Sequence, residues 1–190
     1  IVDKTLAYSK NSDLSAGADI LLNSRNMTVI GNLVISGSAG PYVAIGGALA
    51  VNTVVNTTEA YISGGHTAVF PVPNISAGGS VTLSAIDQSV IVAVSTGLTG
   101  TLALAGGLGV SVGTSLAVTV TDNATRAYIK DSDVTAGGAV TLGAQSTSLI
   151  VSVTVAGSFG VVTGGGGVLG TGAGSVSVNV IHNTQESYIT

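Results

Sequence analysis

Residues 123–142 read NATRAYIKDSDVTAGGAVTL, and both halves of this phrase recur in altered form elsewhere in the chain. The first half returns as NTTEAYIS at 56–63 and NTQESYIT at 183–190, and the second half as SAGADILL at 15–22 and SAGGSVTL at 76–83. Self-similarity at a spacing of several tens of residues is the signature of a repeat protein. The sequence therefore predicts an array of similar units that bury their apolar surface against one another.

One tyrosine per unit provides a reference point for aligning the copies. These tyrosines are Tyr8, Tyr61, Tyr128 and Tyr188, and they are 53, 67 and 60 residues apart. An asparagine stands five residues before three of them, at Asn56, Asn123 and Asn183. We place the repeat units at approximately 8–60, 61–127 and 128–187. Because the phrase is cut at both ends, we expect 1–190 to form one continuous segment of a longer array.

The alternation of apolar and small polar residues indicates the secondary structure. SLAVTVT at 115–121 places Leu116, Val118 and Val120 on one face, and SVSVNV at 175–180 repeats the pattern. A period of two residues is typical of β-strands, and the glycine pairs ahead of several such runs supply turns at positive φ. With 28 glycines, 45% hydrophobic residues and only 7% charged residues, the composition also favours β-structure over helices or disorder.

Three all-β architectures suit units of about 60 residues. A membrane barrel needs girdles of aromatic residues and a sandwich needs large core side chains, whereas only 4% of the residues are aromatic. A solenoid interior suits Val, Ile, Ala and Gly, so we predict an all-β fold, a parallel β-helix (β-solenoid) of about three degenerate ~60-residue repeats. We expect roughly three coils of about 20 residues per unit, which would keep the recurring asparagines at one corner without contact.

Charge and cysteine content exclude several classes of partner and chemistry. With 5 basic residues and a net charge of −4, the chain lacks the basic patch that nucleic-acid binding requires. The absence of cysteine excludes disulfides, thiolate metal sites and cysteine catalysis. Residues 88–121 and 134–185 carry no charge, but Ser, Thr and Gly interrupt them every few positions, so we expect no transmembrane helix.

Two small sets of polar residues are candidates for chemistry. Asp131 and Asp133 would face one side of a strand, where they could share a Ca²⁺ ion with carbonyl groups and water. We favour a simpler interpretation, a solvated corner that keeps an apolar rod soluble, and expect no cofactor. The two histidines, His66 and His182, have no serine and acid partners that the sequence can define. We therefore expect no enzyme activity.

The second unit carries eight extra residues after its tyrosine, in the stretch AYISGGHTAVFPVPNISAG. His66, Phe70, Pro71 and Pro73 lie in this insertion and would form a stiff, partly apolar projection. Loops on a rigid scaffold often carry function. An alternative hypothesis is therefore a direct binding module, in which residues 64–74 contact a glycan or a protein.

The stretch AYIKDSDVTAGGAVTLGAQSTS, followed by a glycine- and valine-rich run and SVSVNVIHNTQESYI, resembles a known pattern. It is similar to the repeat region of very large secreted bacterial exoproteins, including leukotoxin-type filamentous adhesins and filamentous-haemagglutinin-like proteins. The resemblance covers essentially the whole chain and implies a β-helical shaft outside the cell or at the bacterial cell surface. We expect a non-catalytic structural segment of an adhesin or extracellular fibre. Its partners would be flanking repeats of the same chain or end-to-end copies of itself, with a host or cell-surface glycan or protein as a further possibility.

Overall fold

The computed structural model describes residues 1–64, 74–104 and 106–190, and every regular element in these ranges is a β-strand. The strands are β1 (Val2–Lys10), β2 (Leu14–Ala16), β3 (Ile20–Gly40), β4 (Val43–Ser63), β5 (Asn74–Ala77), β6 (Val81–Leu104), β7 (Leu108–Lys130), β8 (Asp133–Ala136), β9 (Val140–Thr163) and β10 (Val168–Ile189). No helix long and apolar enough to cross a membrane occurs in these ranges.

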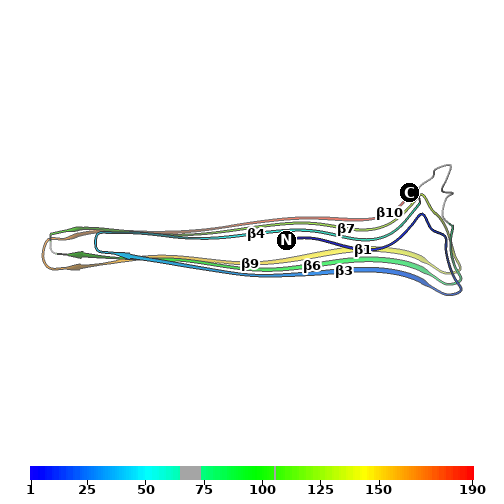
Figure 1. Cartoon of the computed structure of the whole chain (residues 1–190), viewed down its shortest axis with the longest axis horizontal. Helices are drawn as coiled ribbons and strands as arrows, with labels where there is room; N and C mark the ends of the chain where they lie inside the picture. Colours follow the sequence, from blue (N-terminus) through cyan, green and yellow to red (C-terminus); the bar gives the residue numbers. More distant parts are fainter. Residues whose placement is uncertain (65–73, 105) are drawn as a thin grey trace.

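All strand pairs are parallel, and they form three sheets with the orders β1-β4-β7-β10, β2-β5-β8 and β3-β6-β9. The chain passes through the three sheets in turn and returns to the first sheet after each circuit. This path is a parallel β-helix, so the predicted fold class is confirmed. Figure 1 shows the coils nearly superimposed, with the long strands side by side.

The size of one coil differs from the expectation of three short coils per unit. Tyr8 is paired with Tyr61, Tyr61 with Tyr128 and Tyr128 with Tyr188, so each repeat unit makes a single circuit. The glycine pairs ahead of Val81 and Val140 lie between strands, as predicted, but without the positive φ that we expected. The two long strands of a coil nevertheless contain 21 to 24 residues, because the period-two alternation continues through single glycines such as Gly97 and Gly113. Glycine lacks a side chain to pack but fits an extended backbone, so these strands are not broken.

Each coil is strongly flattened. The β1-β4-β7-β10 sheet faces the β3-β6-β9 sheet along most of its length, and the short β2-β5-β8 sheet closes one end, which we call the base (Figure 1). Inside the base lies a cluster of large buried aliphatic side chains, including Ile62, Ile75, Leu83 and Ile129. Their burial supplies a conventional apolar core, at about 25 cal/mol per Å² of apolar surface removed from water.

The opposite end, which we call the blade, comprises the described residues of 28–54, 88–121 and 147–181. Near the base its interior still holds the buried Val54 and Ile91. Farther out the interior is lined by small side chains, and hydroxyl groups link the two sheets: Ser115 Oγ donates to Ser95 Oγ at 2.9 Å and Ser111 Oγ to Thr99 Oγ1 at 2.8 Å. The sheets come into backbone contact there, since a β-carbon at Gly97 would overlap the Thr114 carbonyl oxygen. The blade is therefore a thin two-sheet layer with almost no room for larger residues.

Candidate functional site

The recurring tyrosines form a ladder on the outside of the base. The ring centroids of Tyr8 and Tyr61 are 5.2 Å apart, those of Tyr61 and Tyr128 4.9 Å, and those of Tyr128 and Tyr188 5.1 Å. The rings are stacked with interplanar angles of 11°, 1° and 6°. In-register parallel strands place identical residues one strand spacing apart, so the same residue in each unit produces a continuous stack. The ladder is a structural feature of the repeat.

Burial within the ladder makes the two central tyrosines harder to ionise. Burial, assisted by the nearby Glu59 carboxylate and Tyr61, raises the pKa of Tyr128 from 10.0 to about 12. Burial also raises the pKa of Tyr61. The folded state therefore favours the neutral phenols, and their contribution to stability is fully present below pH 10.

We expect the protein to lose stability between about pH 10 and pH 12, as the Tyr128 phenol ionises more readily in the unfolded chain than in the folded one. A Tyr128→Phe variant keeps the stacked ring but has no ionisable hydroxyl, so its stability should fall less over this range. Urea unfolding at several alkaline pH values, with Tyr42→Phe as the control, measures the difference. Equal pH dependence in both variants would contradict this prediction.

A charged ladder runs beside the tyrosines. Arg126 pairs with both neighbouring coils: its Nη1 lies 3.2 Å from Glu59 Oε1 and its Nε lies 2.8 Å from Glu186 Oε2. The three side chains occupy one register position. Because they are partly exposed, such pairs contribute modestly to stability, about 0–1 kcal/mol each. The pairs instead favour the correct alignment of successive coils, because like charges at adjacent positions would repel one another.

The recurring asparagines lie inside the coil, at the boundary between base and blade. Asn56 and Asn123 are register partners, as are Asn123 and Asn183, so the expectation that they would not meet was wrong. Asn56 Nδ2 donates to Asp87 Oδ1 at 3.2 Å and Ser89 Oγ at 3.1 Å, and Asn123 Nδ2 donates to Ser148 Oγ at 3.0 Å. The asparagines bridge the two long sheets at one level of the coil.

Asp87 is the residue that sequence analysis missed. It is fully buried, accepts hydrogen bonds from Asn26 Nδ2 at 2.9 Å and from Asn56 Nδ2 at 3.2 Å, and occupies the position of Asn26 in the next coil. Burial raises the pKa of the Asp87 carboxyl, although these hydrogen bonds oppose the shift. Asp87 follows the inward-facing Leu83 and Ala85 at intervals of two residues, so the alternation along this strand could have placed its side chain in the interior.

Asp131 and Asp133 lie at a corner of the base. Asp131 adopts a left-handed conformation with φ of 49°, as Asn11 does at 51°, and its backbone N–H donates to the Thr190 carbonyl at 2.9 Å. Asp133 begins β8 and is paired with Asn74. The described residues contain no group of three or more His, Asp or Glu side chains placed to share a metal ion. The geometry places Asp131 in the turn between β7 and β8, and Asp133 at the start of β8.

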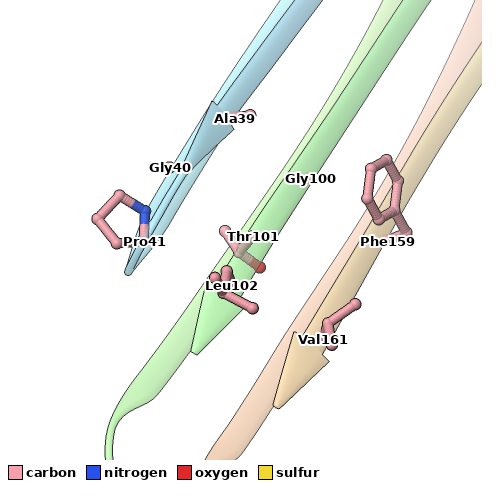
Figure 2. A pocket seen from close by; sticks show the side chains of 8 residues that line it. All are labelled: Ala39, Gly40, Pro41, Gly100, Thr101, Leu102, Phe159 and Val161. Carbon is pink, nitrogen blue, oxygen red and sulfur yellow. The ribbon is translucent and has the colours of Figure 1, made fainter. Parts of the chain in front are cut away.

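The residues of the second-unit insertion that we singled out, His66, Phe70, Pro71 and Pro73, lie outside the described residues. The structure instead reveals an apolar groove of about 460 Å³ near the tip of the blade (Figure 2). The Phe159 ring lies over Gly100, its register partner, and Leu102 and Val161 form the floor beside it. Thr101 is the one polar side chain in the lining, so the groove suits an apolar chain and offers no acid, base or nucleophilic pair.

Comparison with known proteins returned no match: neither a family model, nor a curated protein, nor a solved structure is similar to this chain.

Proposed function

We propose that the chain is a structural segment of a large secreted or cell-surface bacterial adhesin or extracellular fibre, without a catalytic role. The observation that supports this best is the register of the coils. Identical residues stack over successive units in the tyrosine ladder and in the asparagine row. A coil that repeats its neighbour so closely offers its own edge as a template for another.

The outer strands of the stack present unpaired backbone groups at both ends. The N–H groups of Val168, the first residue of β10, and of Thr190, which directly follows β10, donate to the Gly107 and Ile129 carbonyls of the preceding coil, so the backbone groups of even-numbered residues face β7. Odd-numbered residues such as Asn179 therefore direct their backbone N–H and C=O groups to the open edge. A flanking unit or a second copy of the chain would pair with these groups at the ordinary strand spacing of about 4.8 Å.

At high concentration we expect the chain to stack end to end into ribbons. Electron microscopy should show a reflection near 4.8 Å along the ribbon axis and a width of about 70 Å, set by strands of 21 residues or more. Discrete particles without an axial repeat at every concentration would contradict the proposal.

An Asn179→Pro variant provides the matched test of the mechanism. Proline removes an N–H group that faces the open edge, so the pairing of β10 with β7 should survive while stacking on that end is blocked. Asn179→Thr, which reproduces Thr119 of the preceding coil, is the control and should still stack. Ribbons of equal length from both variants would show that β10 is not the stacking edge.

A further inference from the structure

The blade has an inverted distribution of polarity. Its interior contains mainly Ser, Thr, Ala and Gly beyond an isoleucine row near the base (Ile30, Ile91 and Ile150), whereas its outer faces carry large aliphatic side chains in register. Leu33 and Ile35 on one face are 66% and 68% exposed, and Ile45 and Leu49 on the other face are 70% and 57% exposed. Monomeric soluble proteins rarely expose apolar surface of this extent unless it contacts another apolar phase or partner.

Charge ends at the same level on both faces. Residues 28–54, 88–121 and 147–181 contain no Asp, Glu, Lys or Arg. On one face the last charged side chain before the blade is Arg25, which donates to Gln88 Oε1 at 3.2 Å. On the other face it is the exposed Asp122, the register partner of Val55, with Glu59 and Arg126 farther toward the base. The two boundaries are level, because Asn56 Nδ2 reaches across the interior to Thr28 Oγ1 at 3.2 Å.

The tip is apolar as well. Tyr42, in the turn between β3 and β4, is 52% exposed, and Leu108, the first residue of β7, is 69% exposed. Pro41, next to Tyr42, lines the Phe159 groove (Figure 2). A second copy of the chain docked on one face would leave the other face and this tip in water. A lipid bilayer would cover both faces together, and its surface would produce a common charge boundary on the two faces.

The dimensions agree with this environment. The charge-free part of β6 extends from Gln88 to Leu104, about 17 residues or roughly 55 Å at 3.3 Å per residue. The hydrocarbon core of a bilayer is about 30 Å thick, and about 40–45 Å with its headgroup regions. The blade is long enough to traverse that core while the charged base stays in water.

We propose that the blade inserts into a lipid bilayer and that the base, with its tyrosine and Arg126 ladders, remains outside the membrane. The inference rests on the proposed function in one respect. The outer strands expose unpaired backbone groups, which are costly in hydrocarbon, so neighbouring coils or copies must cover them.

Flotation with neutral phosphatidylcholine vesicles tests the proposal, because neutral lipid avoids repulsion by the net charge of −4. The chain should float with the vesicles. A Val92→Glu/Leu116→Glu variant places one carboxylate on each face of the blade and should partition at least about tenfold more weakly. A Thr82→Glu/Thr57→Glu variant adds the same charge to the outside of the base and should float like the unmodified chain.

Tryptophan reporters provide a second readout that does not depend on the glutamate variants folding. The chain contains no tryptophan, so a single Val153→Trp change on the blade and a single Thr141→Trp change at the base are unambiguous probes. Lipids brominated along their acyl chains should quench the first probe several-fold more strongly than the second.

Absence of flotation, or equal quenching of the two probes, would overturn the proposal. Lipid-independent lateral sheets that the blade glutamates dissolve would also overturn it, because the faces would then cover a second copy. Electron microscopy of the same samples without lipid measures end-to-end stacking independently of membrane insertion. Ribbons without flotation would overturn the membrane proposal alone, whereas the absence of ribbons would contradict the fibre function.

Discussion

A Gly97→Val variant will fail to close the blade and will lose about 3 kcal/mol or more of folding free energy. Gly97 faces inward on β6, and a β-carbon there would overlap the backbone carbonyl of Thr114 on the facing sheet. A backbone group in a parallel sheet cannot move aside as the end of a flexible side chain can. The sheets would have to separate along part of the blade, with loss of the Ser115–Ser95 hydrogen bond nearby.

Urea unfolding followed by circular dichroism measures this effect. Gly143→Val is the matched control, because a β-carbon at Gly143 meets no other atom within 4 Å and this outward position lies on a strand of the same sheet. It should be neutral or slightly stabilising, since valine favours extended structure more than glycine does. A Gly97→Val variant as stable as the control would show that the two sheets are not in backbone contact.

The second large effect concerns Asp87. An Asp87→Ala variant leaves the buried Asn26 and Asn56 amide groups without the acceptor that both use, which should cost about 1–3 kcal/mol for each amide that finds no other partner. An Asp87→Asn variant keeps an acceptor oxygen and extends the row begun by Asn26 in the preceding coil. It should be as stable as the unmodified chain or more so at neutral pH.

The sign of the pH dependence follows from the raised pKa of the Asp87 carboxyl. Burial disfavours the charged form in the folded state, so the unfolded chain releases this proton at a lower pH than the folded chain does. The associated stability is present below the unfolded pKa of about 4 and is lost as the pH rises through the folded pKa. Asp87→Asn should remove this loss, and thermal unfolding of both chains between pH 4 and pH 8 would reveal it. A larger loss in the variant would contradict the account.

The fold class could be predicted from the sequence because the repeat and the period-two alternation are local signals. The recurrence of Tyr8, Tyr61, Tyr128 and Tyr188 marks positions that pair between adjacent coils, although we expected successive copies to lie three coils apart. The size of the coil could not be predicted in the same way. Glycine serves both as a turn residue and as a close-contact residue within a strand, and only the facing sheet distinguishes Gly97 from a turn glycine.

The polar interior was harder to predict for a related reason. Alternation defines two faces of a strand but does not state which face is buried, and in the blade the aliphatic face is outside. In the base, the inward position of Leu83 and Ala85 would have placed Asp87 in the interior. Asn56 contacts Asp87 and Thr28 across the interior, and this contact depends on how the two long sheets are aligned by the turns that connect them. No short sequence pattern encodes that alignment.

The central claim is that one repeat unit makes one coil, and a designed cysteine pair tests it most directly in a chain that has no cysteine. Thr57 and Ala124 are register partners on β4 and β7, so their Cα atoms should lie about 5 Å apart, within the range that a disulfide spans. We predict that Thr57→Cys/Ala124→Cys forms an intramolecular disulfide on mild oxidation. Thr57→Cys/Thr114→Cys, displaced by about ten residues or roughly 33 Å along the strand, should not. Free thiols in the first variant, or a disulfide in the second, would contradict the account, because units of three coils each would hold Thr57 and Ala124 about 15 Å apart.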